Sequence, residues 1–367
     1  MRTFVTFTCL FLITLGLPAT AAAQSDIENL VTQTGIEPAA TAVREHARWQ
    51  TPRKVVVRDI VGLYETLAAM EPDVELVAVR TEAEAIAAAP GADAILGFCS
   101  SGVLEAAEDA VWVQVLSAGV ERCVVHDRIR SGDVLLTNMQ KMSSPVIAEH
   151  VIAMMLSLSR SLPSFAKNMD SGQWLRGPDH TGQMVSYGGK TVLIAGLGGI
   201  GTEVARRAAA LDMRVVGTRR SSREGPDFVD YVGLSDELQE LAAEADFIVN
   251  ALPLTDETRG LFDAEFFAGV REGAFFINVG RGKTVVTGDL VEALRSGRLA
   301  GAGLDVTEPE PLPPRHPLWR MDNVIITPHI SSRGGNRIRH GVLAMENLRR
   351  FIAGEPLFNV VDPAAGY

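Results

Sequence analysis

Residues 190–201 read KTVLIAGLGGIG, an apolar run that ends in closely spaced glycines. The glycines match G-x-G-x-x-G, and the context fits, because a strand is expected before them and an amphipathic helix over 202–211. The first glycine permits a tight turn, the second lets the backbone approach a pyrophosphate, and the third lets helix and strand pack closely. The helix N-terminus adds free N–H groups for phosphate oxygens. The stretch therefore predicts a dinucleotide site, with a purely structural turn as the alternative. Its expected contacts are Gly196, Gly198, Gly199, Ile200 and Gly201.

Two arginines follow the next expected strand, in the sequence Thr218-Arg219-Arg220-Ser221. An enzyme that uses NAD usually has an Asp or Glu at this point, which binds the ribose 2′-hydroxyl. Here that carboxylate is replaced by guanidinium groups, which suit a 2′-phosphate through charge and bidentate hydrogen bonds. Arg219 and Arg220 therefore favour NADP(H) over NAD(H), which stays possible. A solvated basic loop is the alternative interpretation.

Short apolar strands alternate with helical stretches on both sides of the glycine turn, as in parallel sheets covered by helices. The sequence predicts an α/β fold with two Rossmann-like parallel-sheet domains, of which the N-terminal one is discontinuous and completed by a C-terminal helix over 335–351. A long apolar helix over 144–162, ended by Pro163, is expected between the two units. The expected strands are 54–60, 74–79, 94–98, 111–116, 134–137, 190–195, 214–218, 247–251, 274–279, 300–305 and 323–327.

The expected division of the chain places the first domain at 51–147 plus 332–367 and the nucleotide-binding domain at 148–331. Residues 24–50 form an N-terminal extension, with a possible helix over 39–49. Residues 1–23 resemble a secretory signal peptide, because a basic start and an apolar run precede small residues. We therefore expect a periplasmic or secreted protein with no membrane attachment after cleavage. An uncleaved anchor, or a cytoplasmic protein with a misplaced start site, is the alternative.

The composition of the chain argues against several classes of binding partner. A net charge of −11 argues against nucleic-acid or anionic-membrane binding. No spacing of cysteine and histidine suggests a metal site. Cys99 and Cys123 would remain after cleavage; two buried thiols are the favoured interpretation, and a disulfide in an oxidising compartment is the alternative.

Three residues suggest a reaction: Arg281, Glu310 and His329. Arg281 and His329 each follow an expected strand, and ligands of open α/β sheets bind outside the carboxyl ends of strands. An Arg, a Glu and a His could therefore converge on one cleft. Taken singly, each has a bland alternative: a salt-bridge partner, a solvated charge and a structural histidine.

In this combination the chain resembles the D-2-hydroxyacid dehydrogenase family over about residues 54–360. The matching segments are ordered and correctly spaced. They are the glycine turn, 116–121 (LSAGVE), 148–150 (AEH), 251–255 (ALPLT), 278–282 (NVGRG), 303–306 (GLDV), 310–313 (EPLP), 316–319 (HPLW) and 327–330 (TPHI).

The resemblance implies a role for each residue. Arg281 would clamp a substrate carboxylate, His329 would protonate the adjacent carbonyl oxygen, and Glu310 would fix the tautomer of the imidazole. The first domain would then bind the substrate. Its residues that would help to hold the carboxylate are Ser101, Ala118 and Gly119. Asp305 would contact the nicotinamide carboxamide. The cofactor groove would be lined by Pro253, Thr255, Val279 and Gly280.

The implied activity is reduction of a small 2-oxoacid of the glyoxylate or hydroxypyruvate kind to the D-2-hydroxyacid with NADPH, or the reverse. The resemblance also implies a homodimer, with the helix after Ser144 and the loop around Trp174 as candidate contacts. Two alternatives remain: a non-catalytic nucleotide-sensing binding protein, and an NAD-linked dehydrogenase of a larger D-2-hydroxyacid.

Overall fold

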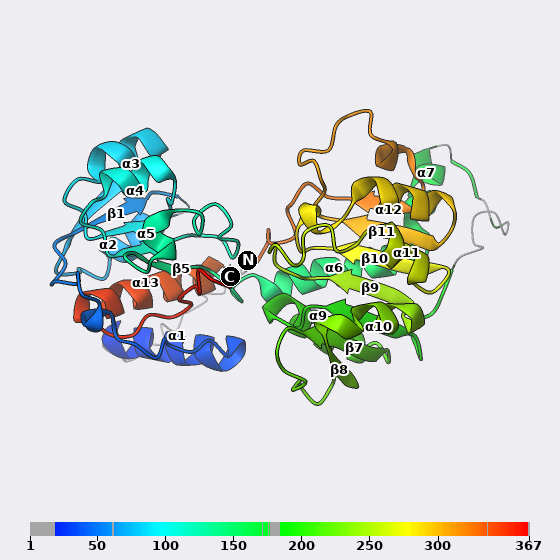
Figure 1. The fold of residues 1–367 in the computed structure, drawn as a ribbon, viewed down its shortest axis with the longest axis horizontal. Coiled ribbons are helices and arrows are strands. Elements are labelled where there is room, and N and C mark those ends of the chain that lie inside the picture. Colours follow the sequence, from blue (N-terminus) through cyan, green and yellow to red (C-terminus); the bar gives the residue numbers. More distant parts are fainter. Residues whose placement is uncertain are drawn as a thin grey trace, which may run out of the picture.

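The computed structural model describes residues 19–60, 62–170, 172–174, 176, 184–335 and 337–365. It has two lobes, each built on one parallel sheet with helices packed against it (Figure 1). This confirms the predicted α/β fold of two Rossmann-like units. Most of the predicted signal peptide, residues 1–18, lies outside the described residues.

The first lobe contains a five-stranded sheet in the order β2-β1-β3-β4-β5. Its strands are β1 (Lys54–Arg58), β2 (Glu75–Val79), β3 (Ala94–Leu96), β4 (Trp112–Gln114) and β5 (Leu135–Thr137). Its helices are α1 (Ala19–Thr34), η1 (Val43–Glu45), α2 (Leu63–Ala68), α3 (Glu82–Ala88), α4 (Ser101–Ala106), α5 (Asp127–Arg130) and α13 (Arg337–Ala353). The C-terminal helix α13 completes this core, since Leu348 and Phe351 are buried with Trp112 of β4. The predicted discontinuity of the N-terminal domain is thereby confirmed.

The second lobe contains a seven-stranded sheet in the order β12-β11-β10-β9-β6-β7-β8. Every residue of the interior strand β6 is buried, as expected of a strand covered by helices on both faces. The strands are β6 (Thr191–Ala195), β7 (Arg214–Arg219), β8 (Tyr231–Leu234), β9 (Phe247–Asn250), β10 (Ala274–Asn278), β11 (Leu299–Leu304) and β12 (Val324–Ile326). The helices are α6 (Ser144–Ser159), α7 (Leu162–Asp170), α9 (Gly199–Ala209), η2 (Ser235–Glu237), α10 (Leu238–Glu244), α11 (Ala264–Gly269), η3 (Gly282–Thr284), α12 (Thr287–Arg295) and η4 (Pro317–Arg320).

Several predicted elements were wrong. The extension forms α1 and the short η1 instead of a helix over 39–49. The edge strand β8 was missed because it is four residues long and contains Gly233, so it shows little periodicity. The long apolar helix breaks at Ser161, whose φ is 53°, and restarts as α7. Pro163 lies in the first turn of α7, where its missing N–H needs no partner, so it does not end the helix.

The two remaining cysteines form a disulfide between Cys99 and Cys123, with Cα atoms 5.4 Å apart. The favoured prediction of two thiols was therefore wrong. The residues are 24 positions apart in the sequence. They follow β3 and β4, which are parallel neighbours, so their carboxyl ends meet at one edge of the sheet.

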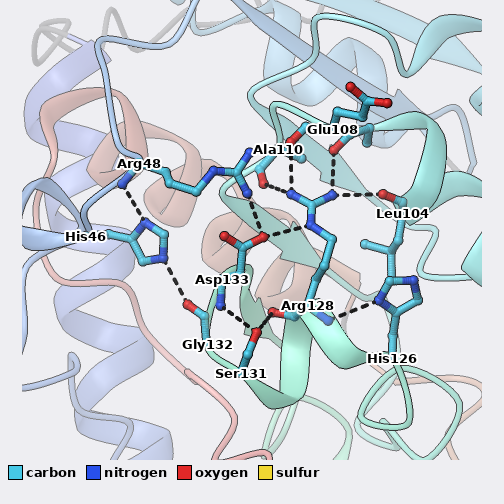
Figure 2. Close-up of polar contacts among 11 residues, drawn as sticks. His46, Arg48, Leu104, Glu108, Ala110, His126, Arg128, Ser131, Gly132 and Asp133 are labelled. Carbon is cyan, nitrogen blue, oxygen red and sulfur yellow. Dashed lines mark hydrogen bonds and ion pairs between the residues drawn. The ribbon is translucent and has the colours of Figure 1, made fainter.

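The N-terminal extension is docked on the first lobe by charged groups (Figure 2). Asp133 accepts hydrogen bonds from Arg48 at 2.6 Å and from Arg128 at 2.8 Å. Arg128 also donates to the backbone carbonyls of Leu104, Ala107, Glu108 and Ala110 at 2.8–3.0 Å. The hydrogen bond from Arg128 lowers the pKa of Asp133; burial opposes this, and Arg48 reinforces it. Asp133 is thus the shared counter-ion that joins the extension to the lobe.

Apolar contacts reinforce this docking. Ile27 and Leu30 of α1 are buried in the same cluster as α13, and the indole of Trp49 donates to the Phe351 carbonyl at 3.2 Å. Within the described ranges, no helix is both long and apolar enough to span a bilayer.

We expect Asp133→Asn to lower the free energy of unfolding by about 1–3 kcal/mol, because two guanidinium groups lose their counter-ion. Urea unfolding followed by circular dichroism measures this. The matched control is Asp127→Asn. Asp127 is 97% exposed, and its contact with Arg130 is long, at 3.7 Å, so this pair should contribute little to stability. Because the folded-state pKa of Asp133 is lowered, the difference between wild type and variant should be present at neutral pH and vanish as the pH falls through that pKa. If Asp133→Asn and Asp127→Asn lowered the free energy of unfolding equally, Asp133 would not be the counter-ion that joins the extension to the lobe.

Candidate active site

Arg281 connects the two lobes. It follows β10, and its Nε donates to Oε1 of Glu121, in the loop after β4, at 2.6 Å. Its Nη1 donates to the Gly280 carbonyl at 2.8 Å. A Cβ at Gly119 would collide with Nη2, so the guanidinium lies directly on the Gly119 backbone. Arg281 and Gly119, which were both predicted to bind substrate, therefore lie together at the junction of the lobes.

The loop that receives Arg281 is held by hydrogen bonds to its carbonyl oxygens. Asn138 donates to the Ala118 carbonyl at 2.9 Å, and the Met139 amide donates to the Ser117 carbonyl at 2.9 Å. The Ser117 hydroxyl closes the turn on the Gly119 carbonyl at 2.8 Å. These contacts fix the backbone on which the guanidinium rests.

His329 and Glu310 form the second pair, with Nδ1 of the imidazole 2.7 Å from Oε1 of the carboxylate. Both side chains are about half exposed. An acceptor at Nδ1 fixes the tautomer, so Nε2 is the atom that can exchange a proton with a substrate. His329 has a φ of 52°, in the left-handed region that non-glycine residues rarely adopt. The predicted pair is therefore assembled on an unusual backbone, a feature frequent at active sites.

Asp305 holds the segment that carries His329. Its buried carboxylate accepts hydrogen bonds from the Thr327 hydroxyl at 2.6 Å and from the amides of Ile330 and Ser331 at 2.9 and 3.0 Å. Burial alone would raise the pKa of Asp305, but these hydrogen bonds outweigh it, and the pKa is lowered. The carboxylate is thus a charged anchor. Its predicted contact with the nicotinamide carboxamide stays a prediction.

His150 of α6 packs against the same segment. Its Nε2 lies 3.0 Å from the Thr327 hydroxyl oxygen and 3.9 Å from Oδ1 of Asp305. This agrees with its interpretation as a packed residue rather than a catalyst. Ser101 is exposed at the start of α4, and among the described residues no hydrogen bond joins its side chain to Arg281 or His329.

The glycine turn is shaped to receive a ligand. Gly196 has a φ of 95° and packs on Leu252. A Cβ at Gly201 would collide with the Gly196 carbonyl oxygen, so the close packing needs glycine there. A Cβ at Gly198 would meet nothing within 4 Å, which leaves the backbone at the start of α9 open to phosphate. The turn therefore fits a dinucleotide.

The neighbouring loops bring the other predicted groove residues to this turn. A Cβ at Gly280 would lie 2.7 Å from the Leu252 carbonyl oxygen, so the loop after β10 lies beside the loop after β9. The Val279 amide donates to the Asn250 carbonyl at 3.1 Å, and the Thr258 hydroxyl donates to the Pro253 carbonyl at 2.7 Å. The Thr255 and Thr258 hydroxyl oxygens lie 3.2 Å apart, within hydrogen-bond distance. The groove residues thus share one edge of the sheet.

The two predicted basic residues differ in their surroundings. Arg219 ends β7, and its Nε is buried with no hydrogen-bond partner among the described residues. Arg220 is half exposed and pairs with Glu257 at 3.4 Å. An unpartnered buried donor is costly, so Arg219 is the better placed of the two for an anionic ligand.

Sequence reasoning missed two charged residues of the site. Glu121 stands in a segment quoted for the resemblance, but nothing in the sequence indicated that it would meet Arg281. Lys141 lies against the first turn of α9, because a Cβ at Gly199 would be 2.8 Å from its Cγ, and its Nζ donates to the Gly35 carbonyl at 2.6 Å. Burial lowers the pKa of Lys141, Glu37 opposes this, and Arg219 lowers it further. Lys141 thus adds positive charge beside Arg219.

In the described parts of the chain, no three His, Cys, Asp or Glu side chains gather as a metal site would require.

Comparisons with known proteins agree with this geometry. The model of the family described as "D-isomer specific 2-hydroxyacid dehydrogenase, NAD binding domain" matches residues 152–331. A human protein named glyoxylate reductase/hydroxypyruvate reductase is 36% identical over 67% of this chain and 75% of its own.

Two solved structures each align with 86% of this chain and 100% of their own, at a TM-score of 0.74. One is a D-isomer specific 2-hydroxyacid dehydrogenase from Xanthobacter autotrophicus Py2 in complex with NADPH and MES, 31% identical. The other is an NADPH-dependent glyoxylate/hydroxypyruvate reductase from Sinorhizobium meliloti in complex with NADP and sulfate, 30% identical. These similarities confirm the resemblance found in the sequence: the chain belongs to the D-isomer specific 2-hydroxyacid dehydrogenase family and is an NAD(P)-dependent oxidoreductase.

Proposed function

We propose that the protein reduces glyoxylate, hydroxypyruvate or a similarly small 2-oxoacid to the D-2-hydroxyacid with NADPH. The observation that carries this is the Arg281 guanidinium, which rests on the Gly119 backbone where the two lobes meet. A planar, permanently charged guanidinium matches a carboxylate through two parallel hydrogen bonds. The names of the human and Sinorhizobium meliloti relatives support the choice of substrate.

The reaction follows from the charges of the groups. Arg281 holds the carboxylate of the oxoacid and, by its positive charge, favours the negative charge that develops on the neighbouring carbonyl oxygen. The nicotinamide ring supplies the hydride when bound. His329 donates the proton from Nε2 to the carbonyl oxygen, while Glu310 holds Nδ1 and stabilises the protonated imidazole. In the reverse direction His329 accepts that proton.

We expect Arg281→Lys and His329→Gln each to lower kcat/KM for glyoxylate by about 10²–10⁴-fold, because each removes a group that acts in the transition state. Steady-state oxidation of NADPH measures turnover, and fluorescence titration should show an unchanged Kd for NADPH. Arg298→Lys and His46→Gln are matched controls away from the site. Near wild-type turnover of either variant would overturn the mechanism. If wild type binds NADPH but turns over no 2-oxoacid, the non-catalytic alternative is favoured.

The preference for NADPH over NADH is proposed to depend on Arg219. Its buried, unpartnered Nε and the nearby charge of Lys141 support binding of a 2′-phosphate. The NADP and NADPH complexes of the two similar structures are consistent with this assignment.

Arg219→Ser should weaken NADPH binding by about tenfold or more, which corresponds to about 1.4 kcal/mol. NADH binding should change by less than about twofold, because NADH lacks the 2′-phosphate. Fluorescence titration with both cofactors tests this. Arg220→Ser is the matched control, and its effect should be smaller because Arg220 already pairs with Glu257. If Arg219→Ser weakened the binding of NADPH and of NADH equally, Arg219 would not be the residue that binds the 2′-phosphate.

We further propose that the protein is exported and acts as a homodimer. The Cys99–Cys123 disulfide supports export, because disulfides persist in oxidising compartments. Exposed apolar side chains on and after α7 support a dimer contact there, since Met169 is 80% exposed and Trp174 is 84% exposed.

Expression of the full chain in a Gram-negative host tests both proposals. The protein should appear in the periplasmic fraction, shortened at its N-terminus, and should elute from a sizing column with light-scattering detection at about twice the chain mass. Recovery in the cytoplasm at full length would overturn export, and a single-chain mass at micromolar concentration would overturn the dimer.

A further inference from the structure

The Cys99–Cys123 disulfide joins the two loops on the substrate side of the first lobe. Cys99 lies in the loop between β3 and α4, two residues before Ser101. Cys123 lies in residues 117–126, the loop after β4, two residues after Glu121. The bond therefore connects the loop that leads to Ser101 with the loop on which Arg281 rests.

The second half of the 117–126 loop depends on local contacts. It forms turns rather than a helix or strand, and the Cys123 and Val124 amides both donate to the Val120 carbonyl at 2.7 and 3.1 Å. The His126 amide donates to the Cys123 carbonyl at 3.1 Å. These short-range hydrogen bonds keep the shape of the turn, and the buried side chains of Val120 and Cys123 pack it on the lobe. The disulfide adds a covalent connection from this turn to the separate loop that carries Cys99.

The position of this loop matters for the charges at the site. Glu121 holds Arg281 at 2.6 Å, and the guanidinium also lies on Gly119. A substrate carboxylate that binds Arg281 must share or replace the contact with Glu121. A shift of the loop by about 1 Å would therefore change the space and the hydrogen bonds available to that carboxylate.

We infer that the Cys99–Cys123 disulfide is a positioning cross-link of the substrate site, which holds Glu121 against Arg281 of the other lobe. This inference rests on the proposed function, because the carboxylate of a 2-oxoacid is the group that the loop would position. Cofactor binding belongs to the second lobe and should not depend on the bond.

The wild-type protein is compared before and after reduction with dithiothreitol. The reagent gives two electrons and two protons to the S–S bond, which becomes two thiols, and is itself oxidised to a cyclic disulfide. Reduction should raise KM for glyoxylate by about fivefold or more, with a smaller change in kcat and an unchanged Kd for NADPH. Removal of the reagent and reoxidation should restore KM.

The double variant Cys99→Ala/Cys123→Ala serves as the control for the reagent. It should show the raised KM without dithiothreitol and no further change with it. If the variant does not fold, the reduced and reoxidised wild type still carries the test. A KM that is the same in oxidised and reduced wild type would overturn the inference, as would a parallel loss of NADPH binding, which indicates general loosening.

Hydrogen–deuterium exchange separates this inference from the proposed function. Reduction should speed amide exchange in residues 117–126 and leave the glycine turn unchanged, whether or not the protein turns over a 2-oxoacid. If the oxidised protein turns over no 2-oxoacid but exchange in the loop responds to reduction, the proposed function fails and the cross-link stands. If exchange in the loop does not respond, the cross-link is not what positions it.

Discussion

The contact between Arg281 and Glu121 is the interaction on which the arrangement of the site depends. It joins a residue after β10 of the second lobe to a loop after β4 of the first, at 2.6 Å. Both are partly exposed, so the pair contributes less to stability than to orientation. The Arg281–Glu121 contact places a fixed positive charge on the Gly119 backbone, where a carboxylate can bind. The carboxyl ends of the parallel strands in both sheets make that meeting possible.

The fold was predictable because its main signals are local. The apolar strand, glycine turn and helix around Gly196–Gly201 are consecutive in the chain, and the order of short strands determines a parallel sheet. The return of α13 to the first lobe was predicted as well. Two predictions of secondary structure were wrong for local reasons. Strand β8 is too short to show periodicity, and the break in the long helix at Ser161 depends on a single left-handed residue.

The site was predictable only in part, because its contacts cross the molecule. Arg281, Glu310 and His329 each stand in a recognisable motif, and the His329–Glu310 pair was expected from them. No local pattern could show that Glu121 would face Arg281, or that Lys141 would lie against Gly199. The disulfide was missed for the same reason: the proximity of Cys99 and Cys123 comes from the pairing of β3 with β4, not from their spacing.

The position of α13 has a consequence for the order in which the protein acquires its shape. The second lobe is contiguous in sequence from β6 to β12, so its core can form without the C-terminal helix. The first lobe, although it is translated earlier, needs Leu348 and Phe351 to fill the space beside Trp112. Its core is therefore complete only when nearly the whole polypeptide is available for folding. The lobe that comes first in the sequence is thus the one completed last, and until α13 docks, the apolar surface around Trp112 stays uncovered.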